Sequence, residues 1–447
     1  MKRDTIIKSS HYGHKPWWFK VLNKAWKAAY PLGTRSCIEK DSLIKAARKA
    51  TGLHDFGKDF WDEPLDRLLR SIKEEADLHP IGTFITRQRM INLLCVRLRA
   101  EEMFRKHPEI LDQPQLPLWV ILGLQRTGTT KLHRLLAADP DNRVLLSWEA
   151  LNPAPLINRN LQFAIRKSEL GTLEPWNPGT LEPGTWNKNL DRRIGIARTS
   201  ENALRIMAPG FFAIHPVEHN APEEDILLLD TTFLSTTPEA TMNVSSYASW
   251  LEKTDQGMAY AYLAKLLKLL QWQRPGKRWI LKSPHHLEFA DLIDKHFDDV
   301  HFLWTHREVT ECIPSFISMT SHSRVIFSDH VDGNAIARHW IRKTGYMLQK
   351  GLDYRNRNQH KDQFIDIIYN ELKDNSRDVL STIYSLDGGL TPELQAKFLK
   401  AERENPMGKY GIHEYRLEDF GVSREDIWKS TVNYRNYFSQ TFSALRP

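Results

Sequence analysis

The stretch "WVILGLQRTGTTKLHRLL", Trp119 to Leu136, decides the fold. It overlaps the apolar run "LPLWVILGL", which is too short for an independent helix and rich enough in Val and Ile to indicate a buried parallel strand. The following "TTKLHRLLAADP" predicts a helix that stops at Asp139-Pro140, with inward positions at Leu132, Leu135 and Leu136. Strand, loop and helix in this order direct a helix N-terminus at the loop, and such a terminus attracts anions.

The loop has the glycine spacing of a nucleoside-triphosphate loop without its lysine. Gly123 and Gly128 have the G-x-x-x-x-G spacing, but Thr129 stands where lysine belongs. Hydrolysis of ATP or GTP is therefore poorly supported, since that lysine and Mg²⁺ neutralise the phosphates. Backbone amides, hydroxyls and one guanidinium remain, from Arg126, Thr127, Gly128, Thr129 and Thr130. They predict a phosphate site that needs no metal.

Further strands are predicted downstream. "WILK" and "VHFLWTH" indicate strands on either side of a helix from Leu287 to Phe297, and "QFIDIIY" indicates another strand that ends at Tyr369. Strands separated by helices are typical of a parallel sheet covered on both faces. The predicted fold class is therefore α/β, a three-layer P-loop-like fold with a central parallel sheet.

Three regions are predicted along the chain. Residues 1–112 form an N-terminal helical region packed on the core, 113–425 form the α/β domain, and 426–447 form a C-terminal tail. A largely helical insertion and lid, at about 153–275, includes the Gly/Pro-rich loop "GTLEPWNPGTLEPGTW". Near the N-terminus, one helical face can hold Trp18, Leu22, Ala25, Trp26 and Ala29. Packing of this face on the core is expected, and a membrane surface is the alternative.

Composition limits the function classes. The 447 residues are 41% hydrophobic, and 62 basic against 55 acidic residues give a formal charge of +7, which suits an anionic ligand. No basic run or nucleic-acid module is found, and no apolar run approaches the ~20 residues of a membrane helix. Cys37, Cys95 and Cys312 lack metal spacing, so a reduced compartment is expected. These features predict a cytoplasmic protein without nucleic-acid binding or stable membrane insertion.

Several motifs together resemble a known family. These are "QRTGTTKLHRLL", "WTHREVTECIPS", "LKSPHHL", "AIHPVEHNAPEED", "SYASWL" and "HEYRLEDFGV". Over roughly Pro108 to Val422 the chain resembles sulfotransferases that use 3′-phosphoadenosine 5′-phosphosulfate (PAPS), in their bacterial-type branch. The resemblance implies that the loop at Arg126 binds the 5′-phosphosulfate, and that Arg307 and Ser315 hold the 3′-phosphate.

The resemblance also implies two further nucleotide contacts. Tyr369 is similar to the adenine-side tyrosine of the family, and Lys409, in "NPMGKYGIHEY", is the nearest match to a late basic segment. Each motif has a simpler interpretation: the Gly-Thr-Thr loop as a capped helix start, Arg307 as a surface arginine, Tyr369 as a core residue. Their positions after predicted parallel strands favour binding, because open α/β sheets bind ligands at that edge.

Sulfuryl transfer needs charge stabilisation and a proton acceptor. By analogy with phosphoryl transfer, Arg126 and Lys282 are expected to stabilise charge on the departing phosphate. Branches of the family place the base after the lysine-containing strand or after the first helix, so His286 and Glu149 are both candidates. The simpler interpretations are a capping or core histidine and a surface or helix-start carboxylate.

The acceptor side is the least determined. His215 is a candidate substrate residue, and a His215–His219 metal pair is disfavoured by Pro216, so no metal is predicted. An apolar pocket for a small aromatic or lipid-like hydroxyl or amine acceptor could use Trp176, Trp186, Phe211, Phe212, Tyr247 and Trp250. The oligomeric state cannot be read from the sequence. A P-loop kinase or NTPase, and a basic nucleic-acid or membrane-surface binding protein, are the alternative functions.

Overall fold

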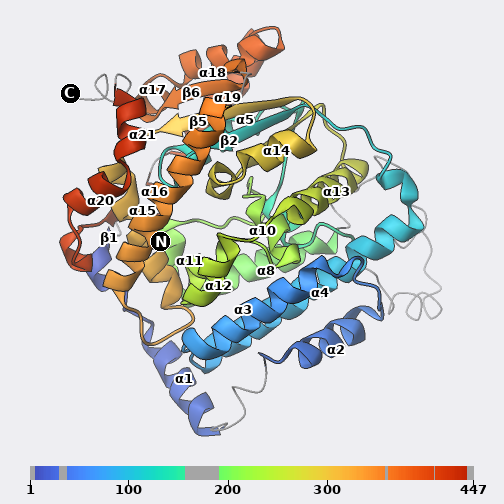
Figure 1. Ribbon diagram of the computed structural model, residues 1–447, viewed down its shortest axis with the longest axis vertical. Coiled ribbons are helices and arrows are strands. Elements are labelled where there is room, and N and C mark those ends of the chain that lie inside the picture. The colour runs from blue at the N-terminus through green and yellow to red at the C-terminus, as the bar shows by residue number, and fades with distance from the viewer. Residues whose placement is uncertain (1–5, 30–37, 157–190, 358–360, 407, 440–447) are drawn as a thin grey trace.

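A five-stranded parallel sheet forms the centre of the protein (Figure 1). The computed structural model describes residues 6–29, 38–156, 191–357, 361–406 and 408–439. In spatial order the strands are β3 (Asn142–Val144), β4 (Arg278–Lys282), β2 (Leu118–Leu122), β5 (Val300–His306) and β6 (Phe364–Ile368). The predicted α/β class with a central parallel sheet is confirmed.

The strand register places the functional loops at one edge. β2 lies between β4 and β5, with Ile121 opposite Lys282 and Leu122 opposite Trp304. All neighbouring strands run in parallel, so their carboxyl ends lie at the same edge. The loops that follow Leu122, Lys282 and His306 therefore meet, although they are far apart in the sequence.

Alternation along β2 explains the two helical layers. Leu118, Val120 and Leu122 belong to one hydrophobic cluster, whereas Trp119 and Ile121 belong to another. The first cluster includes side chains of α13 (Gly257–Gln273), α14 (Ala290–His296), α15 (Val309–Arg324) and α16 (Gly333–Arg357). The second includes side chains of α5 (Thr129–Leu136), α17 (Tyr369–Asp374), α18 (Ser376–Tyr384) and α19 (Pro392–Glu404).

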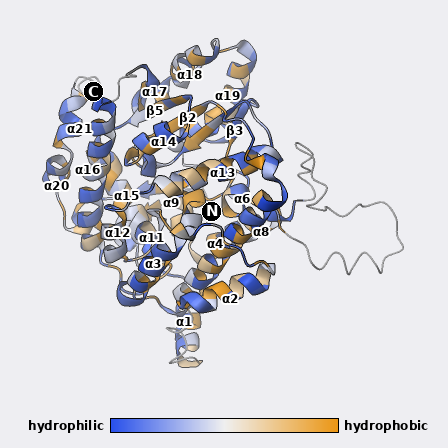
Figure 2. Ribbon diagram, turned by 45° about the vertical axis from the view of Figure 1, so that its right-hand side comes forward, coloured by the Kyte–Doolittle hydropathy of each residue, from blue (hydrophilic) through white to orange (hydrophobic). Residues whose placement is uncertain are grey.

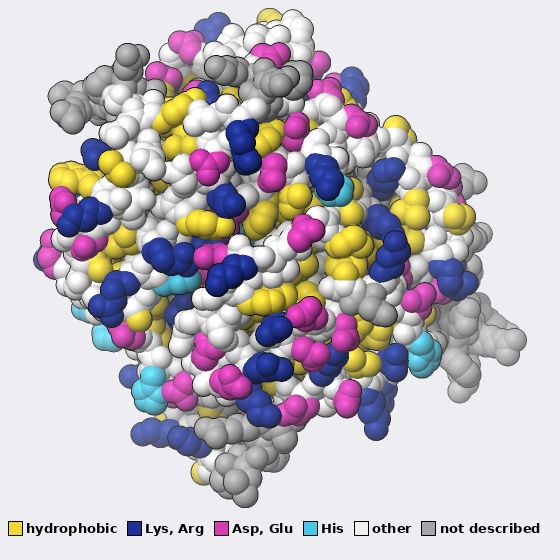
Figure 3. Space-filling model, in the orientation of Figure 1, with side chains coloured by type: hydrophobic (Ala, Val, Ile, Leu, Met, Phe, Trp, Pro, Cys, Tyr) yellow, Lys and Arg dark blue, Asp and Glu magenta, His cyan; other side chains and the backbone are white. Residues whose placement is uncertain are grey.

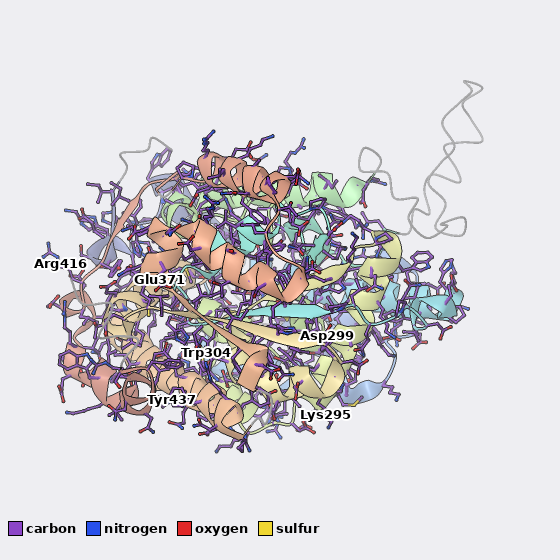
Figure 4. The ribbon with its side chains drawn as sticks, turned by 90° about the horizontal axis from the view of Figure 1, so that it is seen from above. Lys295, Asp299, Trp304, Glu371, Arg416 and Tyr437 are labelled. Carbon is purple, nitrogen blue, oxygen red and sulfur yellow. The ribbon has the colours of Figure 1, made fainter. Side chains whose placement is uncertain are left out.

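The three layers can be followed in Figure 4. Trp304 lies in β5 and Asp299 directly before it, with Glu371 of α17 on one side of the sheet and Tyr437 of α21 (Val432–Tyr437) on the other. On the latter side, Ile427 of α20 (Arg424–Ser430), Tyr434 of α21 and Phe438, directly after α21, are buried. The described part of the predicted C-terminal tail is thus helical and packed, because its aromatic side chains reach the sheet. Residues 440–447 lie outside the described residues.

N-terminal helices extend the first layer. Leu43, Leu65 and Leu94 belong to the same cluster as Val120. They come from α2 (Lys40–Thr51), α3 (Asp62–Glu75) and α4 (Pro80–Lys106). The long helix α4 begins at Pro80, and the His79 Nδ1 accepts a hydrogen bond from the Gly82 amide at 2.9 Å. None of the helices in the described ranges is long and apolar enough to cross a bilayer.

Helix α1 (Trp17–Ala29) differs from its prediction. Only Phe19 and Asn23 of this helix are buried, and the Asn23 Oδ1 accepts a hydrogen bond from the Ile81 amide at 3.0 Å. Leu22 is 51% exposed and Trp26 is 37% exposed, so the expected packing of this face on the core is wrong. Figures 1 and 2 place α1 at one end of the long axis, opposite α18 and α19.

Between α5 and β4 the described chain is mostly helical, as expected for the insertion. Its helices are α6 (Ser147–Leu151), α8 (Arg192–Met207), α9 (Pro209–Ile214), α10 (Ile226–Leu229), α11 (Thr237–Thr241), α12 (Ser245–Leu251) and α13. The "GTLEP" loop, with Trp176 and Trp186, lies outside the described residues. Cys95 and Cys312 are buried free thiols, and Cys37 also lies outside the described residues.

A second, two-stranded sheet was not predicted. β1 (Ile6–Lys8) pairs in parallel with β7 (Ile412–Glu414), and Ile7 lies opposite His413. The two strands are about 400 residues apart in the chain, and each has only three residues. This small sheet attaches the N-terminal segment to the late loop that passes the candidate site.

Candidate active site

The loop after β2 is shaped by two glycines with positive φ. Gly123 has φ +138°, and a Cβ there would lie 2.2 Å from the Thr305 Oγ1. Gly128 has φ +92°, and its Cβ would lie 3.0 Å from the Tyr369 ring. The Thr127 hydroxyl donates to the Leu124 carbonyl at 2.6 Å, and its Oγ1 lies 2.7 Å from the Thr305 Oγ1. The backbone thus makes a tight turn into α5, which only glycine permits at these two positions.

Arg126 lies on the outer part of this loop. Its φ of +70° is unusual for a side-chain-bearing residue. The guanidinium donates from Nε to the Ser315 Oγ at 3.1 Å and from Nη1 to the Ile214 carbonyl at 3.2 Å. Thr129 begins α5 and is buried, whereas Thr130 is exposed. The loop and the start of α5 thus place hydroxyls and amides beside one arginine.

Arg307 follows β5 and reaches the same loop. Its Nη1 donates to the Arg126 carbonyl at 2.9 Å across 181 residues, and its Nε donates to the Glu311 Oε2 at 3.0 Å. The guanidinium lies 4.3 Å from the centroid of the Tyr369 ring. Arg126, Arg307, Ser315 and Tyr369 are therefore brought together, because their loops follow neighbouring strands.

Lys282, the last residue of β4, lies on the other side of β2. Its ammonium forms an ion pair with the Glu224 carboxylate at 2.5 Å. Its backbone amide donates to the Asp225 Oδ1 at 2.9 Å. Two consecutive carboxylates, from the turn before α10, thus fix the backbone and the side chain of this lysine. The Lys282 side chain is 4% exposed, so its position is tightly determined.

His286 is fully buried beside this lysine. Its Nε2 lies 2.5 Å from the Asp225 Oδ2 and its Nδ1 lies 2.8 Å from the Tyr260 hydroxyl. Both ring nitrogens are therefore engaged inside the protein. Asp225 joins the ring to the backbone of Lys282, so the geometry supports a positioning role for His286 rather than direct contact with a substrate.

Glu149 has its own set of partners. Its Oε1 accepts from Arg143 at 2.7 Å, and its Oε2 lies 3.0 Å from Arg274. The Glu149 side chain is 1% exposed, and burial alone would raise its pKa. The two arginines and the Leu146 amide outweigh burial and lower the pKa of the carboxyl. An ion-paired carboxylate of this kind is a weak base, so the geometry weighs against the expected catalytic role and supports a structural one.

Two groups near Lys282 have shifted proton affinities. Burial raises the pKa of the Glu223 carboxyl, against the opposing effect of Lys282. Burial lowers the pKa of His215 to about 4, with Glu224 opposing and Lys282 and Arg126 adding to the effect. At neutral pH His215 is thus uncharged. Glu223, Glu224 and Asp225 were not nominated from the sequence, although "PEED" was part of a quoted motif. Three adjacent carboxyl residues before an apolar run were the available signal.

Lys409 contacts the loop that follows α9. Its ammonium is 3.3 Å from the Glu218 Oε1, and the other Glu218 oxygen lies 2.5 Å from the Arg134 Nη2. The Tyr410 hydroxyl also donates to Glu218. Lys409 is thus held against the loop that carries His215, and its contact differs from the expected pairing with a 3′-phosphate.

A pocket of about 430 Å³ adjoins this charged group. Its wall combines Arg134, Glu218 and His219 with apolar side chains that include Ala137, Ala138, Pro222 and Ala401. The His219 Nδ1 lies 2.6 Å from the Glu201 Oε2, so this ring is bound to a carboxylate. The described residues contain no group of three or more His, Cys, Asp or Glu side chains placed to hold a metal ion.

The aromatic residues expected at the acceptor have different environments. Tyr247 is 1% exposed and donates its hydroxyl to the Phe233 carbonyl at 2.7 Å, and Phe212 is 2% exposed. Both are core residues. Phe211 and Trp250 are half-buried.

Comparisons with known proteins agree with this geometry. The model of the Sulfotransferase family matches residues 117–388, which is more than half of the chain. The crystal structure of the sulfotransferase STF1 from Mycobacterium tuberculosis is similar at 26% identity, with a TM-score of 0.72, covering 88% of this chain and 98% of that one. The sulfotransferase STF9 from Mycobacterium avium is similar at 24% identity, with a TM-score of 0.75, covering 89% and 96%.

A search of curated proteins found no match. The family match covers the loop of Arg126, the strand of Lys282 and the loop of Arg307, and it confirms the resemblance of the sequence motifs. The fold, the site geometry and this match together show that the chain belongs to the sulfotransferase family.

Proposed function

We propose that this sulfotransferase moves a sulfuryl group from PAPS to a hydroxyl or amine of a small apolar or aromatic acceptor, without a metal. The observation that supports PAPS most directly is the contact between Arg307 and the Arg126 loop. Two arginines, a serine and a helix N-terminus at one sheet edge suit a nucleotide with two separate phosphate groups.

The proposed nucleotide contacts follow three neighbouring strands, β2, β5 and β6. The loop from Arg126 to Thr130 and the start of α5 would hold the 5′-phosphosulfate, with backbone amides supplying most of the donors. Arg307 and Ser315 would hold the 3′-phosphate, and Tyr369 would contact the adenine. Ser315 already accepts a hydrogen bond from Arg126, so the two phosphate subsites share a contact.

The reaction needs a cation at the leaving group and a base at the acceptor. Arg126 and Lys282 would stabilise the negative charge that develops on the departing phosphate. Glu223 is the proposed proton acceptor, because it interacts electrostatically with Lys282 and burial raises its pKa. His286 would position Lys282 through Asp225.

The acceptor is proposed to enter through the pocket at Arg134 and Pro222. Its alanine and proline wall suits an apolar or aromatic body, and Glu218 and His219 suit a polar group. His215, which is uncharged at neutral pH, would contact the acceptor between this pocket and Lys282.

Ligand-induced stabilisation tests the nucleotide assignment. The product nucleotide 3′,5′-diphosphoadenosine (PAP) should raise the melting temperature at micromolar concentrations, whereas Mg·ATP should not. Transfer of labelled sulfate from PAPS to a panel of phenols, long-chain alcohols and amines should then identify the acceptor. Stabilisation by Mg·ATP alone, with release of phosphate, would instead establish a kinase or NTPase.

A further inference from the structure

Helix α1 presents an exposed apolar face at one end of the molecule. Trp17 is 77% exposed, Val21 is 55% exposed and Leu22 is 51% exposed. The Trp26 ring lies 5.6 Å from the ring of Phe84 on α4, and Phe84 is itself 47% exposed. Single exposed apolar residues are ordinary, but a group of five on adjoining elements indicates an interaction surface.

Lysines flank this face on the same helix. At about 100° per residue, the apolar side chains of α1 occupy one broad sector, and Lys20, Lys24 and Lys27 occupy a neighbouring one. All three lysines are exposed. Residues 6–29 contain no Asp or Glu. In Figure 3, the end of the molecule where α1 lies shows dark-blue basic side chains.

The helix is fixed to the body of the protein along a third sector. Phe19 is 2% exposed and packs edge-on against His79, with ring centroids 5.4 Å apart. The Asn23 side chain accepts a hydrogen bond from the Ile81 amide, and the Lys15 ammonium forms an ion pair with Asp329 at 2.6 Å. These contacts keep the apolar and basic sectors directed away from the protein.

We propose that α1 docks this protein on the surface of an anionic lipid bilayer. The helix is about 20 Å long, and it would lie in the plane of the interface with its Trp and Leu side chains among the acyl chains. Lys20, Lys24 and Lys27 would contact anionic head groups. Charge complementarity selects this occupant. A second copy of α1 would bring lysines against lysines, and a nucleic acid would leave the apolar sector in water.

Vesicle co-sedimentation of the full chain tests the proposal. Vesicles of equal parts phosphatidylglycerol and phosphatidylcholine should bind the native protein, whereas pure phosphatidylcholine vesicles should bind it weakly. Binding should fall as salt rises, because the lysine contribution is screened. The double variant Trp17→Ser with Leu22→Ser, and the triple variant Lys20→Glu, Lys24→Glu and Lys27→Glu, should each lower the partition coefficient by about tenfold or more.

Matched controls keep the test specific. The double variant Ile206→Ser with Leu399→Ser removes apolar side chains that are 64% and 46% exposed on α8 and α19, and it should bind vesicles as the native protein does. Circular dichroism and the PAP-induced melting shift should be unchanged in all variants. Equal vesicle binding by native protein and α1 variants would overturn the proposal. So would a dimer that the α1 variants dissolve, or salt-sensitive DNA binding without vesicle binding.

Discussion

At the scale of single residues, Arg307 is the side chain whose replacement best tests whether this site binds a nucleotide. It stacks on Tyr369 and contacts the Arg126 loop, and its ion pair among the described residues is with Glu311, on the helix that follows it. Loss of a charge-assisted contact costs about 1.5 to 3 kcal/mol, so Arg307→Ala should weaken PAP binding by about one to two orders of magnitude. Isothermal titration calorimetry measures this.

Arg342→Ala is the matched control for that substitution. Arg342 of α16 is half-exposed and pairs with Glu252 at the end of α12, away from the Arg126 and Arg307 loops in its contacts, so its removal should leave the affinity for PAP unchanged. If Arg307→Ala also leaves the affinity unchanged, Arg307 does not contact the nucleotide.

Glu149 should prove structural when it is replaced. Glu149→Gln leaves Arg143 and Arg274 without their carboxylate in a buried site, which should lower the free energy of unfolding by about 3 to 5 kcal/mol. Because folding lowers the pKa of Glu149 below 4.5, its stabilisation is present at neutral pH and is lost as the pH falls through the folded value. Denaturant titrations at pH 7 and pH 4 measure both effects. A correctly folded variant with a thousandfold lower kcat would instead make Glu149 the base.

Glu223 should control the acidic limb of the pH profile. Glu223→Gln should lower kcat by about 10²- to 10⁴-fold, because a general base contributes about this much. The affinity for PAP should be kept, which separates a proton-transfer role from nucleotide binding. In the native enzyme, activity should rise with pH as the Glu223 carboxyl loses its proton, at a pH above the ordinary value of 4.5. If Glu223→Gln keeps the acidic limb of the pH profile, Glu223 is not the general base.

At the scale of elements, the small β1–β7 sheet contacts the proposed nucleotide site from outside the main sheet. His413 on β7 places its Nδ1 3.4 Å from the Ser315 Oγ and its Nε2 2.9 Å from the Ser318 Oγ. Burial and the nearby Arg126 lower the pKa of His413 to about 3, so the ring is neutral at physiological pH.

Disruption of β1 is therefore expected to weaken binding at the proposed nucleotide site. Ile7→Pro removes a backbone donor opposite His413, and it should weaken PAP binding by about three- to tenfold by loosening the His413–Ser315 contact. Ile7→Thr, which keeps a β-branched side chain in the strand, is the control and should bind PAP normally. Equal affinities in a melting-shift titration would show that β7 is held in place without β1.

The sequence predicted those elements whose residues alone, over a short stretch, indicate a strand or a helix. β2, β4, β5 and β6 are apolar runs beside turn signals. In contrast, β3 is only Asn142, Arg143 and Val144, and its polar residues give no strand signal. The β1–β7 pair depends on a partner about 400 residues away. The amphipathic pattern of α1 predicted a helix correctly, but it does not distinguish an apolar face that packs on the protein core from one that contacts a membrane.

The site residues likewise divide into those predicted from local sequence and those that depend on distant contacts. The Arg126 loop could be nominated from spacing because its geometry is local. Glu149 was nominated without knowledge of Arg143 and Arg274, and the contact with Arg274 spans 125 residues. Glu224 was missed because its pairing with Lys282 spans 58 residues and leaves no periodic trace.

At the scale of the whole molecule, a buried ion cluster joins several helices behind the site. The Lys343 ammonium of α16 lies 2.9 Å from Glu288, 3.3 Å from Glu252 and 4.0 Å from Glu239. Arg342 also pairs with Glu252, so these two cations together face three carboxylates. Burial, opposed by Lys343 and assisted by the neighbouring carboxylates, raises the pKa of Glu288 to about 7.

This cluster should give the protein an unusual pH dependence. The folded state keeps a proton on Glu288 that the unfolded state loses above pH 4.5, so this group lowers the free energy of unfolding as the pH rises from 4.5 to about 7. The expected loss is about 3 kcal/mol. Glu288→Gln should flatten the decline between pH 5 and pH 7.5, whereas the exposed control Glu425→Gln should not. If the free energy of unfolding declines equally with pH in the native protein and in Glu288→Gln, the titration of Glu288 does not cause the decline.

The adjacency of β2 and β5 has a consequence for how such enzymes diversify. The two arginine-bearing loops follow neighbouring central strands, so the sheet sets the spacing of the arginines that are proposed to hold the donor. The chain between α5 and β4 also contacts these groups, through the Ile214 carbonyl at Arg126 and through Glu224 and Asp225 at Lys282. A chimaera that exchanges this segment to change the acceptor should therefore keep those three residues if it is to inherit the same donor chemistry.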